Sequence, residues 1–317
     1  MFLRISRRIA LSLFLLAVCG NAGAAAPLRI ATFNLEWLVT TANENNMSPW
    51  KNEEDLEKHR RNLAQILAEN VHADIVCVLE STSKRALEKL VSEPALSPMH
   101  YRIYHLESED FATGQDVAFL ARVPLDRIAG RDINDFRGRG KDPLTKRAII
   151  YLTSGKLKLG ILGMHLLAHP DDARRTRRRI SQASAASRLV RDEIVARGYT
   201  PIVLGDLNDF DSDIQGGEGY SKRRRVIHIL KDFDWKKSGD ELFNSAERIQ
   251  SLSERYSAYW DLNKNGIRDR DEPLSLMDHI LIDRSLSARL MKAEILHEPK
   301  DGSVSDHWPV VVELTTL

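Results

Sequence analysis

The chain contains very little cysteine, which limits both how it is stabilised and what chemistry it can do. Only two cysteines occur in 317 residues, Cys19 and Cys77. Cys19 lies in a segment that we expect to be removed, so a disulfide framework is excluded and the hydrophobic core must hold the protein together. Cys77, inside the apolar run "DIVCVLE", is expected to be a small packed hydrophobe. The shortage of thiolate ligands also argues against zinc.

Signatures of several other protein classes are missing as well. The formal net charge is only +1, so no overall field favours binding to nucleic acid or to membranes. We find no internal repeat, low-complexity tract or Pro/Ser-rich linker. There is no Gly-x-Ser-x-Gly motif, and the glycines of "FRGRGKD" do not have P-loop spacing. These absences argue against a serine hydrolase of the Gly-x-Ser-x-Gly type and against a P-loop nucleotide-binding protein.

The N-terminus is typical of an export signal. Three arginines precede an apolar run over residues 9–18, and small residues follow. We therefore expect a signal peptide over residues 1–24 and a mature chain that begins at Ala25, in the periplasm or outside the cell. The apolar run is too short for an ordinary transmembrane helix, so no stable membrane insertion is expected. The alternatives are an uncleaved anchor or lipid attachment at Cys19, which lacks the small residue that usually precedes a lipidated cysteine.

Short apolar runs alternate with helical stretches through the rest of the chain. The runs predict strands at Leu28–Phe33, Ile75–Leu79, Val117–Ala121, Ala148–Leu152, Leu157–Met164, Ile202–Leu204, Ile280–Ile282 and Val310–Leu314. Amphipathic spacing predicts helices over Asn52–Glu69 and Asp171–Ala196. Because no linker interrupts this alternation, we predict one α/β domain over residues 25–317.

Residues capable of chemistry stand at the ends of the predicted strands. Glu80 and Asp206 each end an apolar run, and His307 precedes the last one. These side chains converge only if the strand ends gather in one cleft, which is the usual location of a site in sheet proteins. The oxygen atoms of acids and amides at these strand ends are the ligands that suit Mg²⁺, Mn²⁺ or Ca²⁺. Two histidines beside carboxylates suit a general base and a general acid around a metal-held phosphate.

Six motifs in order resemble those of a known family. "ATFNLEW", "DIVCVLE", "GMHL", "GDLND", "MDHILI" and "SDHWPV" are similar to motifs of the endonuclease/exonuclease/phosphatase superfamily. This superfamily includes pancreatic-type deoxyribonucleases, abasic-site endonucleases and bacterial sphingomyelinases. The resemblance runs from Ile30 to Leu314. It implies a two-sheet, four-layer α/β sandwich with the active site at the strand ends.

The resemblance also implies roles for residues at the motif positions. Glu80 matches the main metal ligand, with Asn34 beside it and Asp306 as a further ligand. Asp206 matches the acid that positions or deprotonates the attacking water. Asn208 matches the amide that holds the phosphate, and it shares a face with Asp206 in an extended segment.

Two histidines receive roles in the same way. His307 matches the histidine of the "SDH" signature, and Asp278 matches the acid that orients it. His165 matches a second histidine of the deoxyribonuclease branch, a candidate for protonating the leaving oxygen. The partner of that histidine would be Gln115 or Asp116 in "TGQDVAFLA".

Other polar or aromatic residues near these motifs favour structural interpretations. We expect a solvated turn at Asp209, Asp211 and Asp213, a surface or ion-paired side chain at Glu36, a structural histidine at His279, a loop position at His169, and core packing at Trp308.

Basic residues are clustered although the net charge is small. The clusters lie at residues 137–141, 174–179 and 222–225. Such stretches are ordinarily solvated faces, but in a phosphodiesterase they are also candidates for contacts with nucleic-acid phosphates, with Arg175 and Arg179 as representatives. Lys146 and Arg147, at the entry to a predicted strand, are separate candidates for a direct phosphate contact.

The stretch "DLNKNGIRDRDE" matches a calcium-loop pattern. Asp261, Asn263 and Asn265 supply oxygen atoms at alternate positions, Gly266 permits a sharp turn, and Glu272 ends the loop. The alternative is a polar, turn-rich insertion. Since no long helix is evident on either side, this would be a structural Ca²⁺ site and not a full EF-hand.

The sequence thus predicts an exported phosphodiesterase that depends on Mg²⁺ or Mn²⁺, most consistent with an endonuclease acting on DNA or RNA. The first alternative is a phospholipid phosphodiesterase of the sphingomyelinase type. The second is a catalytically inactive binding module. No protein partner is inferred from the sequence.

Overall fold

The computed structural model describes residues 26–129, 144–215, 225–234, 236 and 242–317. The predicted signal peptide, the basic stretch at 137–141 and residues 222–224 lie outside this part of the chain. None of the helices in the described part has the length and apolar character that crossing a bilayer requires.

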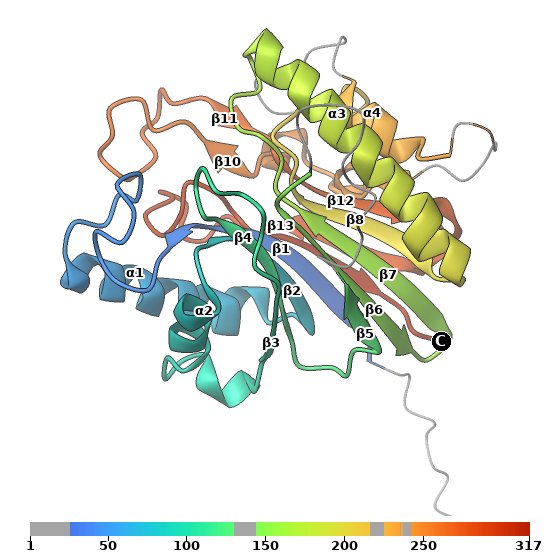
Figure 1. The fold of residues 1–317 in the computed structure, drawn as a ribbon, viewed down its shortest axis with the longest axis horizontal. Coiled ribbons are helices and arrows are strands. Elements are labelled where there is room, and N and C mark those ends of the chain that lie inside the picture. Colours follow the sequence, from blue (N-terminus) through green and yellow to red (C-terminus); the bar gives the residue numbers. More distant parts are fainter. Residues whose placement is uncertain (1–25, 130–143, 216–224, 235, 237–241) are drawn as a thin grey trace, which may run out of the picture.

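Two mixed β-sheets form the centre of the described structure, each with six strands (Figure 1). The first has the order β13-β14-β1-β2-β4-β3 and comprises β13 (Leu290–Ile295), β14 (Val310–Leu314), β1 (Leu28–Leu38), β2 (Ile75–Ser81), β4 (Asp116–Ala121) and β3 (Arg102–His105). The second has the order β5-β6-β7-β8-β12-β9 and comprises β5 (Arg127–Ala129), β6 (Arg147–Ser154), β7 (Leu157–Met164), β8 (Thr200–Asp206), β12 (Asp278–Asp283) and β9 (Leu242–Asn244). All eight predicted strands are present.

Helices cover the outer face of each sheet (Figure 1). The α-helices are α1 (Glu53–Gln65), α2 (Lys84–Val91), α3 (Ala173–Leu189) and α4 (Val226–Lys231). The first two pack on the first sheet through one hydrophobic cluster, and the last two pack on the second sheet through another. A third cluster fills the space between the sheets. The predicted four-layer α/β sandwich is therefore confirmed.

The two predicted helices begin where side-chain caps can form. Asn52 accepts a hydrogen bond from the backbone N–H of Asp55 at the start of α1, and Asp172 accepts from the N–H groups of Arg174 and Arg175 at the start of α3. Both helices continue past their α-helical bounds, as π-helical turns over Ile66–Val71 and Val190–Ile194. Short 3₁₀ turns lie at Ser97–Met99, Val195–Arg197, Ser245–Arg248, Leu252–Glu254 and Arg284–Arg289.

The space between the sheets is filled without a gap at Cys77. Its thiol is buried, and burial raises its pKa well above the usual value. A Cβ atom added at Gly163 would lie 2.5 Å from the Cys77 Sγ and 2.9 Å from the Phe119 Cζ. Cys77 is thus a packed core residue, as predicted.

A small hairpin stands at one end of the sandwich. Its strands are β10 (Ala258–Tyr259) and β11 (Leu274–Ser275), and the calcium-loop pattern connects them. Ala258 also forms a β-bridge with His307, and Tyr259 donates a backbone hydrogen bond to the Asp306 carbonyl. The hairpin is therefore attached to the segment that carries the "SDH" motif.

Candidate active site

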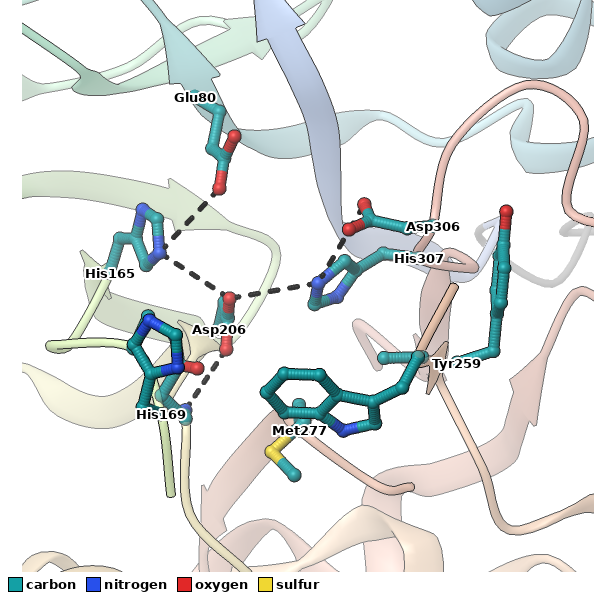
Figure 2. Close-up of a pocket in the computed structure, with 12 residues that line it drawn as sticks. Glu80, His165, His169, Asp206, Tyr259, Met277, Asp306 and His307 are labelled. Atoms are coloured by element: carbon teal, nitrogen blue, oxygen red, sulfur yellow. Dashed lines mark hydrogen bonds and ion pairs between the residues drawn. The ribbon is translucent and has the colours of Figure 1, made fainter. Parts of the chain in front are cut away.

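Strand directions bring the predicted site residues to one end of both sheets. β1 runs parallel to β2, and β7 runs parallel to β8, so the carboxyl ends of each pair lie together. β12 is antiparallel to β8 and pairs Asp278 with Asp206, while β14 is antiparallel to β1, which puts the residues before β14 at the same end. The cleft at this end is lined by Glu80, His165, Ala168, His169, Asp206, Asn208, Ala258, Tyr259, Trp260, Met277, Asp306 and His307 (Figure 2).

His307 is held by a buried acid. Its Nδ1 lies 2.6 Å from the Asp278 Oδ2, so the ring donates through Nδ1 and turns Nε2 toward Asp206, 3.9 Å away. Ser257 donates its hydroxyl to the same Asp278 oxygen at 2.9 Å. Although burial lowers the pKa of His307, the carboxylates of Asp278 and Asp306 raise it well above its usual value. The two carboxylates therefore favour the protonated form of this imidazole at the cleft.

Asp206 occupies the centre of the residues drawn in Figure 2. Its Oδ1 accepts the backbone N–H of Asn208 at 2.9 Å. Burial raises the pKa of Asp206 to about 7, while the nearby positive charge of His307 opposes the rise. A carboxyl group with a pKa near neutrality can both accept and release a proton.

Two of the motif residues at the cleft have strained backbone conformations. Glu80 has φ of 63° and Asn208 has φ of 46°, a region that residues other than glycine enter at an energetic cost. Glu80 aims its carboxylate at Asn34 and at the backbone N–H of Trp37. Asn208 donates its side-chain amide to the Leu166 carbonyl at 3.1 Å. Both side chains are therefore fixed in orientation.

Asn34 links two of the cleft carboxylates. Its Nδ2 donates to the Glu80 Oε1 at 3.1 Å and lies 3.3 Å from the Asp206 Oδ2, while its Oδ1 accepts the backbone N–H of Glu36. The side chain thus offers its nitrogen, not its oxygen, to the site. In this arrangement Asn34 holds the two carboxylates in position beside each other.

Glu36 interacts electrostatically with Asp306, Glu80 and His307, although it does not line the cleft and the sequence did not predict this interaction. Burial raises its pKa well above the usual value, and the charges of Asp306 and Glu80 add to the rise. Burial likewise raises the pKa of Asp306 to about 6, with Glu80 and Asp278 contributing. The sequence did contain a signal for Glu36, because it follows Asn34 by two residues in the strand that ends at the cleft.

His165 is buried beside Glu80 and Asp206. Its Nε2 lies 3.4 Å from the Asp206 Oδ2 and 3.8 Å from the Glu80 Oε1, and its Nδ1 has no hydrogen-bond partner. Burial lowers its pKa well below the usual value, and Lys146 and His307 lower it further. These effects favour the neutral form of the ring, and the predicted donation of a proton to the leaving oxygen stays a prediction.

Neither residue predicted to partner His165 does so. Asp116 accepts from the ring of His105 at 2.6 Å, and Gln115 accepts from the Lys146 Nζ at 3.1 Å. The sequence left open whether Gln115 or Asp116 would face His165. In the structure both side chains bond to other residues. Lys146 itself is nearly buried, and burial lowers its pKa while Glu80, Asp110 and Asp206 oppose the change.

The donor chemistry of the cleft fits a hard divalent cation. Glu80 and Asp306 supply carboxylate oxygens at the cleft, and burial together with repulsion from Glu80 and Asp278 disfavours the charged form of Asp306. In the described part of the chain, no three His, Cys, Asp or Glu side chains converge as a ready-made ion cluster. The fit therefore rests on the kind of donor and on the excess of negative charge.

Two acids after β8 are not solvated, contrary to prediction. Asp209 is fully buried and lies 3.4 Å from the Nε of Arg179, which is also fully buried. Asp211 is buried and lies 2.7 Å from the Lys231 Nζ. Only Asp213 is exposed as expected. The prediction was wrong because the balancing cations come from α3 and α4, which are distant in sequence.

The same ion pair corrects the prediction for Arg179. Its guanidinium donates to the carbonyls of Leu167, His169 and Pro170 at 2.9–3.1 Å. A side chain with no exposed surface cannot contact nucleic acid, so Arg179 is a structural residue that fixes the segment between β7 and α3. Among the other predicted basic contacts, Arg175 is partly exposed, and Arg147 is buried with its guanidinium bonded to the Leu144 carbonyl.

The three remaining structural predictions agree with the structure. His279 is buried and bonds to the Asn244 amide and to the Asp209 carbonyl, away from the cleft. Trp308 is buried and donates to the Pro299 carbonyl. His169 is an exposed loop residue, but it also lines the cleft.

The segment from Asp261 to Glu272 is folded into a closed loop. Asp261 accepts the backbone N–H groups of Asn265 and Gly266, and Asn263 accepts the same Asn265 N–H. Glu272 is buried and accepts from the N–H groups of Leu262 and Asp269. The predicted oxygen-bearing side chains thus accept hydrogen bonds from backbone N–H groups of their own loop.

Comparison with known proteins gives a match to one family and several similar structures. The model of the endonuclease/exonuclease/phosphatase family matches residues 31–307. A 3′–5′ exonuclease, NExo, from Neisseria meningitidis is 19% identical, with a TM-score of 0.64 over 90% of this chain and 99% of that one. A structure of NExo from Neisseria described as a 3′ phosphatase bound to a product DNA hairpin is 18% identical, with a TM-score of 0.62 and the same coverage.

A more distant similarity is to TDP2 from Caenorhabditis elegans. It is 16% identical, with a TM-score of 0.57 over 91% of this chain and 74% of that one. At these identities the similarity establishes the fold alone. No curated protein matches the sequence.

Proposed function

Because the chain belongs to the endonuclease/exonuclease/phosphatase family, we propose that it is an exported, divalent-metal-dependent phosphodiesterase that cleaves DNA or RNA internally. The observation that carries the proposal is the convergence of Asp206 with the His307–Asp278 pair in a cleft rimmed by carboxylates. These groups can activate water and neutralise the charge of a phosphate.

The residues of the chain divide this work between them. Asp206, with its pKa near 7, accepts the proton of the attacking water. His307, held protonated by Asp278, neutralises negative charge that develops on the phosphoryl oxygens. Asn208 orients Asp206 through its backbone N–H and borders the cleft where the phosphate would bind.

We assign the metal to the carboxylate side of the cleft. Glu80 and Asp306, with Asn34 beside them, would hold Mg²⁺ or Mn²⁺, and the ion would supply Lewis-acid polarisation of a phosphoryl oxygen. Asn34 and His165 keep the Glu80 and Asp206 carboxylates in place through their contacts of 3.1–3.8 Å. His165 is thus a positioning residue in this proposal.

Nucleic acid is the proposed substrate because cationic groups border the cleft. Lys146 interacts electrostatically with Glu80 and Asp206 inside the site, and Arg175 lines a depression beside it. Other exposed arginines lie along α3, away from the cleft. Lysine and arginine at phosphate spacing supply most of the sequence-independent affinity for nucleic acids.

The test is incubation of residues 25–317 with Mg²⁺ and three substrates: supercoiled plasmid, single-stranded RNA and sphingomyelin vesicles. We expect nicked plasmid or shortened RNA. The Asp206→Asn and His307→Ala variants should lose this activity, and the control Asp213→Asn should keep it. Cleavage of sphingomyelin alone would show that the substrate is a phospholipid and not a nucleic acid. Binding of nucleic acid without any cleavage would make the protein a binding module. Product lengths separate internal from terminal cleavage.

A structural Ca²⁺ site is proposed for the loop over residues 261–272. Its side-chain oxygens occur at the positions that the calcium-loop pattern requires and already bond to the loop backbone, and Glu272 is buried. We expect Ca²⁺ to raise the melting temperature of the parent protein and not that of an Asp261→Ala variant. Equal effects of Ca²⁺ on both proteins would exclude binding at this loop.

Export is proposed from the N-terminal sequence alone. We expect N-terminal sequencing of protein from the periplasm or the medium to begin at Ala25. A membrane-bound product that incorporates labelled fatty acid, and loses it in a Cys19→Ala variant, would show lipid anchoring in its place.

A further inference from the structure

Trp260 is an exposed aromatic side chain at the edge of the active cleft. It follows β10 directly and keeps 40% of its surface exposed, whereas Trp308 is 2% exposed. Its backbone N–H donates to the Pro273 carbonyl at 3.1 Å, which closes the hairpin behind it. A large indole left in water beside a catalytic cleft is an available surface for a ligand.

Three adjoining depressions share this one side chain. The first is the catalytic cleft, with Asp206 and His307 on its wall. The second is lined by apolar side chains that include Phe210 and Leu262. The third leads to the start of α3 and includes Arg175. Trp260 therefore stands where the catalytic cleft opens onto the surrounding surface.

The backbone that carries the indole is held against the catalytic residues. Two residues before it, Ala258 bridges to His307, and Tyr259 donates to the Asp306 carbonyl at 3.1 Å. On its other side the exposed ring of His169 lies at a centroid distance of 6.2 Å, tilted by 43°. A group bound at the phosphate position is thus followed by an aromatic surface on the way out of the cleft.

We propose that Trp260 stacks against an unpaired nucleobase next to the scissile phosphate. The proposal rests on the proposed function and names the form of substrate that this site prefers. A base inside a duplex keeps both faces stacked on its neighbours, so only an unpaired or terminal base can present a face to the indole. Stacking is tolerant of sequence because every base has an aromatic face.

The charges around the third depression favour stacking over a purely electrostatic contact. Arg175 lines it and can meet a neighbouring phosphate, but Asp171 and Asp172 line it too. This wall is therefore not strongly positive, and the aromatic ring has to supply much of the affinity for the adjoining nucleotide.

The test uses matched single-stranded oligonucleotides with one cleavable linkage. One carries normal bases, and in the others the nucleotide on either side of that linkage lacks its base. Values of kcat and KM are measured for the parent, Trp260→Ala, Trp260→Phe and the control Met291→Ala, which alters a side chain 63% exposed on β13. Affinity for an uncleavable analogue of each strand is measured separately by fluorescence anisotropy.

We expect Trp260→Ala to lower kcat/KM on the normal strand by about 5- to 150-fold, the range of base–aromatic stacking, mostly through KM. On one of the base-less strands the loss should be about twofold or less. Trp260→Phe should retain more activity than Trp260→Ala, and Met291→Ala should match the parent.

Equal losses on all strands would overturn the proposal, because the indole would then have only a structural role. If Trp260→Ala lowers kcat/KM on a fully paired duplex as much as on the normal single strand, the requirement for an unpaired base is overturned. If the parent cleaves none of the strands, the proposed nuclease function fails. The anisotropy measurement then decides on stacking: no difference between the normal and base-less strands in the parent would overturn it.

Discussion

Replacing Arg179 with methionine should destabilise the protein severely while leaving its surface charge almost unchanged. The guanidinium is fully buried, faces the fully buried Asp209 carboxylate at 3.4 Å, and donates to three carbonyls of the segment before α3. Removing one partner of a buried ion pair leaves an uncompensated charge and costs about 3–5 kcal/mol. Of these three carbonyls, only that of His169 belongs to an exposed residue and can readily bind water; Leu167 is half-buried and Pro170 is buried, so the loss of their donor adds to the cost.

The free energy of unfolding, measured by urea denaturation, should therefore fall by about 3–5 kcal/mol in Arg179→Met. Arg177→Ala, an exposed neighbour on α3, should stay within about 0.5 kcal/mol of the parent. Adding Asp209→Asn to Arg179→Met should recover part of the loss, since the unpaired charge is then removed. An Arg179→Met variant as stable as the parent but weaker in DNA binding would refute this reasoning and restore Arg179 as a phosphate contact.

Three further variants test the core and the site. Burial lowers the pKa of His59 from 6.5 to about 4, so the unfolded chain binds more protons than the folded chain between pH 6.5 and pH 4. The free energy of unfolding should therefore fall by about 3 kcal/mol as the pH drops from 6.5 to 4. His59→Gln should remove this dependence of stability on pH. Gly163→Ala should cost about 1–3 kcal/mol because its methyl group would overlap the Cys77 Sγ. Asp278→Asn should lower kcat by about 10²–10⁴-fold with a small effect on KM, because His307 loses the carboxylate that orients and charges it.

Each of these expectations has an outcome that contradicts it. A pH slope unchanged in His59→Gln would place the acid sensitivity elsewhere. A Cys77→Ala change that fails to relieve Gly163→Ala would show that the overlap is not with the thiol. A normal pH–rate profile and kcat in Asp278→Asn would show that His307 acts without its partner.

The central strands could be predicted from the sequence because they are buried on both faces. β2 and β4, for example, read as continuous apolar runs. The edge strand β3 was missed because its half-exposed residues, Arg102–His105, give no apolar signal. The hairpin strands β10 and β11 have two residues each, too few for any periodicity.

At the site, residues fixed by the strand ends could be predicted, and those fixed by long-range pairing could not. Asp206 and His307 lie together because strand directions bring them together. The burial of Asp209 depends on Arg179, thirty positions away, and nothing local in "GDLNDFDSD" indicates it. Trp260 was not singled out because its exposure is set by a hairpin whose closure depends on backbone hydrogen bonds.

The most direct test of the account is hydrolysis of bis(4-nitrophenyl) phosphate by residues 25–317 as Mg²⁺ is titrated. The account predicts nitrophenolate release that requires Mg²⁺, is abolished by EDTA, falls at least about 100-fold in Asp206→Asn, and is unchanged in Asp213→Asn. Hydrolysis that persists in Asp206→Asn, or none by the folded parent at any Mg²⁺ or Mn²⁺ concentration, would contradict it.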